Sequence, residues 1–113
     1  MSFRSDTLLW MLQRASAAVL ALCVLVHLVT IIYAVQGGLS AAEILGRTRG
    51  NYGWAAFYSV FVLACAVHVP IGLRAVFAEW LAWRGRSRAV ALVAFAALIG
   101  ATGMRAVIGV FAG

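Results

Sequence analysis

Three long apolar stretches, almost free of charged side chains, constrain this chain more than any other feature of its sequence. Residues 15–36 carry no charged side chain, and residues 54–78 and 89–111 carry one arginine each. A helix needs about 20 consecutive apolar residues to cross the hydrocarbon core of a bilayer, and each stretch is long enough. The sequence therefore predicts an all-α integral membrane protein with three transmembrane helices, running up, down and up, in a single domain over residues 1–113.

The composition agrees with a chain whose main solvent is lipid. Of its 113 residues, 65% are hydrophobic and 11% are charged, whereas soluble domains carry about 25% charged residues. All nine basic residues are arginines, and the formal net charge is +6. They gather at the ends of the apolar stretches and not along one polar face, which indicates topology signals and contacts with lipid headgroups or a cofactor. Nucleic acid is not an expected partner.

Two polar connections separate the apolar stretches. They are a polar loop at residues 37–53, in which Ser40 leads a short amphipathic turn, and a basic turn at residues 79–88. Pro70 is expected to bend the second helix mildly without breaking it, because membrane helices tolerate proline where neighbouring groups satisfy the freed carbonyl.

The N-terminal lead-in is expected to lie in the membrane interface. Ser5 and Asp6 are predicted to cap a helix that starts near Thr7, since their side-chain oxygens can accept from the free N–H groups of a first turn.

The distribution of arginines predicts the orientation of the chain. Arg4, Arg14 and the basic turn place the N-terminus in the cytoplasm by the positive-inside rule, whereas Arg47 and Arg49 oppose this orientation.

The two histidines, His27 and His68, lie inside the first and second apolar stretches and suggest haem ligation. His27 follows Arg14 by 13 residues, about 20 Å along a helix, and His68 precedes Arg74 by six residues, about 9 Å. If both arginines mark one interface, the histidines lie at different depths and do not share a haem. Each would then need an opposing ligand from another helix, most simply in another subunit.

The helical face around His68 fits a haem better than the face around His27. Small residues surround His68 on its stripe, so that a flat macrocycle could lie close, whereas the stripe around His27 is bulkier. The His68 stripe consists of Phe61, Ala64, Cys65, His68, Gly72, Ala75 and Glu79. A hydrogen bond from either histidine to a neighbouring helix remains the alternative. A metal-only site is not favoured, because no acidic or cysteine ligand shares a face with a histidine at the right depth.

Four polar or aromatic residues are candidates for binding a quinone. The Arg14 guanidinium could donate to a haem propionate or a quinone oxygen, and Ser16 shares the face of His27. Glu79 shares the face of His68, and Trp80 offers an indole N–H at the interface. Each of them could instead be an ordinary interfacial residue.

Two motifs resemble those of a known family, the membrane-anchor cytochrome b subunits of succinate dehydrogenase and fumarate reductase (complex II). Leu12-Gln13-Arg14-Ala15-Ser16 is similar to the Arg-x-Ser/Thr start of a first helix in these anchors. His68-x-x-x-Gly72-x-Arg74, followed by Glu79-Trp80, is similar to their haem-ligand helix. With the length and the three-span layout, the resemblance covers nearly the whole chain.

The resemblance implies a set of cofactors and partners. His68 would be an axial ligand of haem b, beside Gly72 and Arg74, and Arg14 would lie near a propionate and the quinone pocket. The segment from Asp6 through His27 also resembles the fourth helix of single-chain, two-haem anchors, which implies a second haem at His27.

By the same resemblance, a second membrane anchor would supply the opposing haem ligands. Flavoprotein and iron–sulfur subunits would bind at the membrane, here the inner (plasma) membrane of the cell. The chain would be a non-flavin subunit of the enzyme, not catalytic alone. In place of the acidic–tyrosine pair of some anchors the chain has Glu79-Trp80, so it lacks that tyrosine hydroxyl.

Two other functions remain open on the sequence. The chain could be the haem b subunit of another quinone-linked dehydrogenase or hydrogenase, although these usually spread several histidines over four or more helices. It could also be a small structural membrane subunit without haem, whose histidines make contacts between helices.

Overall fold

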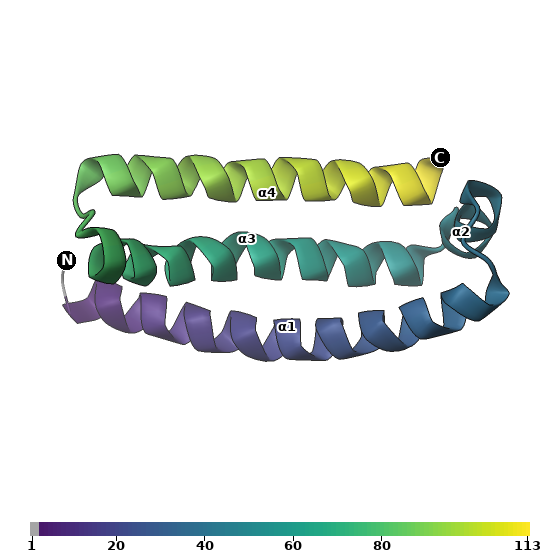
Figure 1. Cartoon of the computed structure of the whole chain (residues 1–113), viewed down its shortest axis with the longest axis horizontal. Helices are drawn as coiled ribbons and strands as arrows, with labels where there is room; N and C mark the ends of the chain where they lie inside the picture. The colour runs from purple at the N-terminus through teal and green to yellow at the C-terminus, as the bar shows by residue number, and fades with distance from the viewer. Residues whose placement is uncertain (1–2) are drawn as a thin grey trace.

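The computed structural model describes residues 3–113 and consists of four helices. They are α1 (Phe3–Gly37), α2 (Ala41–Thr48), α3 (Tyr52–Leu81) and α4 (Arg86–Ala112). Three of them, α1, α3 and α4, are long and apolar enough to cross a membrane. In Figure 1, α3 runs between α1 and α4, and the short α2 lies at the end away from the N-terminus. The predicted all-α fold with three spans is confirmed.

The first long helix begins earlier than the sequence analysis predicted. Ser5 and Asp6 lie inside α1 and do not cap it, and the helix runs without interruption from the lead-in into the first span. No glycine or proline occurs between residues 3 and 36, so nothing in the chain separates an interfacial helix from a spanning one. The helix stops where Gly37 and Gly38 follow, and Gly38 has a φ of 110°, a conformation that glycine adopts without steric cost.

The predicted turn led by Ser40 is the helix α2. The Ser40 hydroxyl accepts from the backbone N–H of Glu43 at 3.2 Å, and the Glu43 carboxylate accepts from the backbone N–H of Ser40 at 2.9 Å. This capping box satisfies two free donors of the helix start. The N–H and hydroxyl of Ser40, with a smaller contribution from Arg47, hold the pKa of Glu43 below its usual value.

The loop that holds α2 is tied to the chain just after α1 and to the C-terminal end of α4. Arg47 Nη2 donates to the carbonyl of Gly38 at 2.8 Å, and the N–H of Gly50 donates to the carbonyl of Phe111 at 2.9 Å. Arg49 donates to the backbone oxygen of Gly113. These bonds fix the α1–α3 connection against the end of α4.

The second span extends farther than predicted at its basic end. Asn51 caps α3 by accepting from the N–H of Trp54 at 3.1 Å, and the helix continues through Pro70 to Leu81. Ala82 then adopts the left-handed conformation, with a φ of 52°, and ends the helix. The turn to α4 is therefore shorter than the predicted residues 79–88.

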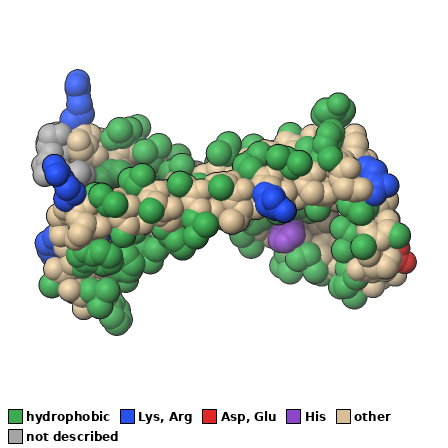
Figure 2. Space-filling view, turned by 90° about the horizontal axis from the view of Figure 1, so that it is seen from above, with side chains coloured by type: hydrophobic (Ala, Val, Ile, Leu, Met, Phe, Trp, Pro, Cys, Tyr) green, Lys and Arg blue, Asp and Glu red, His purple; other side chains and the backbone are tan. Residues whose placement is uncertain are grey.

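The chain buries few apolar side chains and exposes many. Among the described residues, the buried apolar side chains are those of Cys23, Ala64, Pro70, Leu92 and Val107. Hydrophobic side chains cover most of the face seen in Figure 2, while basic side chains gather mainly at the end that holds the N-terminus. Exposed apolar faces on membrane helices are available to lipid or to the helices of other subunits.

A close approach of α3 and α4 occurs at Gly103. A Cβ atom at this position would lie 2.5 Å from Val62 Cγ1, whereas a Cβ atom at Gly100, one turn earlier, would meet nothing within 4 Å. A glycine in a membrane helix can let another helix approach closely. Gly103 does so within the chain, and Gly100 faces open space.

We predict that Gly103→Ala destabilises the packing of α3 on α4, because overpacking a close contact costs about 1–3 kcal/mol. The measurement is the apparent melting temperature of the purified protein, which should fall. Gly100→Ala is the matched control and should leave it unchanged or raise it. Equal melting temperatures for the two variants would contradict the observed contact, and Val62→Ala should restore part of the loss in Gly103→Ala.

Candidate functional site

His68 lies half-buried in the middle part of α3 and faces α1. Its Nδ1 atom lies 3.3 Å from the hydroxyl oxygen of Ser16, which is only 7% exposed. The same hydroxyl donates to the backbone carbonyl of Gln13 at 3.1 Å. A polar chain of three groups therefore connects the two apolar helices.

The hydrogen-bond directions in this chain determine which nitrogen of His68 is free. A serine hydroxyl has one proton; when Ser16 donates it to the carbonyl of Gln13, the hydroxyl oxygen accepts from the N–H at His68 Nδ1. The Nε2 atom then carries the lone pair of the neutral imidazole. Within the described residues Nε2 makes no hydrogen bond, and it is not among the buried unpaired atoms. His68 can therefore offer Nε2 as a ligand to a group at the surface of the chain.

This arrangement has the form of a histidine ligand supported from behind. Histidines that bind a metal usually donate from their other ring nitrogen to a fixed acceptor, which sets the tautomer and the ring orientation. Ser16 is such an acceptor for His68. His68, supported by Ser16, therefore fits the role of an axial ligand of a haem iron, to which this chain would contribute one imidazole nitrogen.

The small residues on the His68 stripe serve partly to pack α1. A Cβ atom at Gly72 would lie 3.2 Å from Gln13 Nε2, and Ala64 is buried. Part of the surface that was expected to accommodate a macrocycle is therefore used inside the chain. The Nδ1 atom of His68 faces Ser16 of α1, so one side of the imidazole is occupied within the chain.

His27 lies in a different and more apolar environment. Its ring meets those of Tyr58 and Phe61 in T-shaped, edge-to-face contacts, with ring centres 6.0 and 5.7 Å away. Its Nδ1 atom is buried and has no hydrogen-bond partner among the described residues. Cavities of about 380 and 410 Å³ adjoin this ring, and Thr48 of α2 lines both of them. His27 thus lacks the fixed acceptor that supports His68.

The antiparallel packing of α1 and α3 separates the two histidines along the membrane normal. His27 lies eleven residues after Ser16, and its neighbour Tyr58 lies ten residues before His68. Eleven residues span about 16 Å of helix. The predicted difference in depth is therefore present in the structure, and the two imidazoles do not face one another.

The structure does not gather the four quinone-site candidates at one place. Arg14 is exposed and lies over the ring of Trp10, 5.4 Å from its centre, whereas Ser16 is buried against His68. Glu79 is exposed, and Trp80 is 80% exposed. Glu79 and Trp80 lie nearer the end of the molecule that carries the basic turn. Gln13 meets α3 at Gly72, and Glu79 follows Gly72 by seven residues, which is about 10 Å of helix.

The last sequence candidate, Arg74, faces a different part of the molecule. It lines a groove between the ends of α1, α3 and α4 that includes neither histidine. The sequence analysis missed Gln13 and Tyr58 as site residues. Their roles depend on the register of α1 against α3, and no local pattern in either helix carries that register.

Three features now define the class of protein. The chain has three membrane-spanning helices, an intramembrane histidine with one ring nitrogen held by a serine, and most of its apolar surface exposed. It is a multi-pass membrane protein whose exposed apolar faces are available to lipid or to the helices of other subunits.

The family follows from comparison with known sequences. The family model for the succinate dehydrogenase/fumarate reductase transmembrane subunit matches residues 1–103, which is most of the chain. The protein therefore belongs to this family and is a membrane subunit of that complex, together with other subunits. No curated protein and no solved structure matches the chain.

Proposed function

We propose that this chain is a membrane anchor of a succinate:quinone or fumarate:quinone oxidoreductase, with His68 as an axial ligand of haem b and a contribution to the quinone site. The observation that carries the haem assignment is the contact between Ser16 and His68 Nδ1, which leaves Nε2 as the free imidazole nitrogen. Flavin and iron–sulfur chemistry belongs to partner subunits, and the anchor links the iron–sulfur subunit to quinone.

In this function the chain positions groups and does not itself carry out the redox chemistry. When bound between two imidazoles, haem b supplies one-electron transfer without an open position for oxygen. Ser16 fixes the ring plane and the tautomer of His68, and Gln13 fixes Ser16. A second membrane anchor supplies the opposing ligand, because within the described residues no second imidazole lies opposite His68.

A second haem at His27 is the natural extension of this proposal. The ring lies beside a cavity and at a depth different from that of His68. Its orphaned Nδ1 makes it the weaker ligand of the two, since the supporting hydrogen bond usually raises ligand basicity. An opposing ligand would again come from the second anchor.

Arg14 and Ser16 both lie near the level of His68, and Arg14 is the better supported candidate for binding the quinone. The proton of Ser16 is already committed to Gln13, so this hydroxyl has nothing to donate to a quinone carbonyl. The exposed guanidinium of Arg14 has several donors and a positive charge, and both favour a quinone oxygen that becomes negative on reduction. Glu79 and Trp80 do not lie beside Arg14, and we assign them to the interfacial edge of this proposed site, about 10 Å nearer the basic end.

The orientation is proposed from the charges at the two ends. The end that holds the N-terminus carries the basic turn with Arg84, Arg86 and Arg88, whereas the opposite end, with α2, carries Arg47 and Arg49 (Figure 1). By the positive-inside rule the N-terminal end faces the cytoplasm, and the membrane would be the inner (plasma) membrane.

We predict that His68→Ala removes the b-type α-band that this histidine supports, because alanine offers the iron no ligand. The measurement is the reduced-minus-oxidised spectrum of the purified complex, with the haem-to-flavin ratio. His27→Ala is the comparison: it keeps the band if the complex holds one haem, and lowers the ratio by one haem if it holds two. An unchanged ratio in His68→Ala would remove it as a ligand, and a wild-type complex without any b-type band would favour a structural subunit.

We predict that Ser16→Ala keeps His68 as ligand but weakens haem binding by roughly 10-fold or more, the usual effect of losing such an outer hydrogen bond. The midpoint potential should rise, because an imidazole that no longer donates from Nδ1 is less basic and stabilises the oxidised iron less. Redox titration of the haem band is the measurement. Ser16→Thr retains the hydroxyl and should stay near wild type. Equal potentials for Ser16→Ala and the wild type would contradict the assigned role.

We predict that Arg14→Gln lowers kcat/KM for quinone by roughly 10-fold or more, since a hydrogen bond to a charged group contributes about 1.5–3 kcal/mol. Steady-state assays with a short-chain quinone are the measurement. Arg14→Lys should lose less, because the charge remains, and Arg4→Gln is the control for overall charge. Succinate oxidation with a soluble electron acceptor should stay unchanged, and a parallel loss there would place the effect outside the quinone site.

A further inference from the structure

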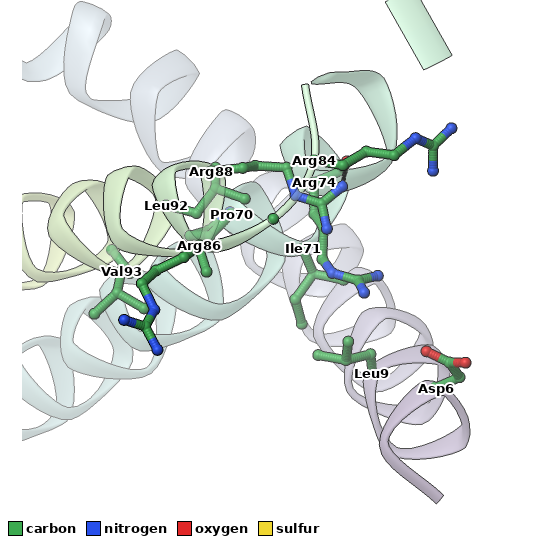
Figure 3. A pocket seen from close by; sticks show the side chains of 13 residues that line it. Asp6, Leu9, Pro70, Ile71, Arg74, Arg84, Arg86, Arg88, Leu92 and Val93 are labelled. Atoms are coloured by element: carbon green, nitrogen blue, oxygen red, sulfur yellow. Dashed lines mark hydrogen bonds between the residues drawn. The ribbon is translucent and has the colours of Figure 1, made fainter. Parts of the chain in front are cut away.

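A basic groove lies at the end of the molecule where the N-terminus and the α3–α4 turn meet. It measures about 850 Å³ and has contributions from α1, α3, α4 and the turn. Figure 3 shows its lining, with Asp6 and Leu9 on α1 and the arginines on the other elements. The arginines are Arg74, Arg84, Arg86 and Arg88.

We propose that this groove binds an anionic glycerophospholipid, with its phosphate among the arginines and its acyl chains along the apolar wall between α3 and α4. This proposal goes beyond the function proposed above. It depends on neither histidine, because neither of them lines the groove.

The charge of the groove is strongly unbalanced. Four arginines line it against a single carboxylate, Asp6, and among the described residues no ion pair joins that carboxylate to any of them. The side chain of Arg86 makes no hydrogen bond within this part of the chain. A phosphate with its several acceptor oxygens is the anion that guanidinium groups bind best, by charge-assisted and often forked hydrogen bonds.

One arginine is held in place and still has an unused donor. Arg88 Nη1 lies 3.3 Å from the carbonyl of Arg74 and 3.5 Å from that of Trp83, so the side chain bridges the turn. Its Nε atom is buried and has no partner among the described residues. A buried charged donor without an acceptor is costly, and a phosphate oxygen in the groove would satisfy it.

The shape of the groove selects an amphiphile and not a soluble anion. Below the arginines its wall is apolar, with Pro70 and Leu92 buried. Along α4 the lining runs from Arg86 to Ala96, ten residues, or about 15 Å at the rise of a helix. That distance is about half of the hydrocarbon thickness of a bilayer, so acyl chains would lie along the wall while the headgroup stays at the interface.

The test uses the purified complex, stripped of bound lipid with detergent and titrated with phosphatidylglycerol or phosphatidylcholine. Native mass spectrometry of the complex measures the occupancy of the first bound lipid. The wild type should prefer phosphatidylglycerol. Each basic side chain near an anionic lipid contributes roughly a 5-fold factor in binding, so Arg84→Gln/Arg86→Gln should reduce the preference by about 25-fold.

Arg4→Gln is the matched control, because it removes an exposed arginine near the same end of the chain that does not line the groove. It should keep the preference for phosphatidylglycerol. Arg86→Gln alone keeps the proposal testable if the double variant fails to assemble, since this side chain makes no hydrogen bond within the described residues. Its preference for phosphatidylglycerol should fall by about 5-fold.

Three results would overturn the proposal. One is equal binding of the two lipids by the wild type, and another is an unchanged preference in the arginine variants. The third is full competition by millimolar glycerol phosphate, which would make the groove a site for a soluble anion. In the second case, loss of the iron–sulfur subunit from the variants would assign the arginines to a protein partner instead. The haem-to-flavin ratio should not change in any variant, so the outcome is independent of the haem proposal.

Discussion

The antiparallel register of α1 against α3 is the constraint on which the rest of the site depends. It places Ser16 at His68, Gln13 at Gly72 and His27 at Tyr58. A single interhelical hydrogen bond in a membrane contributes only about 0.6 kcal/mol on average, so the bond between Ser16 and His68 cannot set the register alone. The close packing at Gly72 and the short connection through α2 must hold it, and the polar chain then follows.

The connection through α2 is more ordered than a polar loop needs to be. Its capping box and the bond from Arg47 to the Gly38 carbonyl fix where α1 ends, and the Asn51 cap fixes where α3 begins. Because both ends are fixed, a slip of one helical turn between α1 and α3 would break several polar contacts at once. The position of Ser16 beside His68 is thus determined partly from the opposite side of the membrane.

Much of the fold could be predicted from the sequence, because most of this chain lies in the hydrocarbon core of a membrane. Lipid requires each span to satisfy its own backbone hydrogen bonds, so uncharged stretches of sufficient length identify the helices. The capped start of α2 was also readable from Ser40. The continuity of α1 was missed, because polar residues near its start were interpreted as a boundary, although no helix-breaking residue stands there.

The site was less predictable, since helix faces are periodic but registers are not. The sequence placed Ser16 on the face of His27, and this is consistent with both residues facing α3. It could not indicate that Ser16 meets His68, which is 52 positions away. The surroundings of the arginines were also unpredictable, because the sequence around Arg14 and Arg74 does not show what each guanidinium contacts. The structure places the first over Trp10 and the second in a basic groove.

The distribution of exposed surface gives a physical reason why this chain acts as part of an assembly. Among the described residues it buries only five apolar side chains, and it leaves the lipid-depth faces of all three spans largely open. On the proposed function it supplies one imidazole nitrogen per haem, so each haem site is complete only when a second anchor is in place. Haem binding and subunit association would then stabilise each other, because a ligand that binds only the assembled state shifts the equilibrium toward it. The bond from His68 to Ser16 prepares one half of that site before the partner arrives, since the ring is already oriented within the single chain.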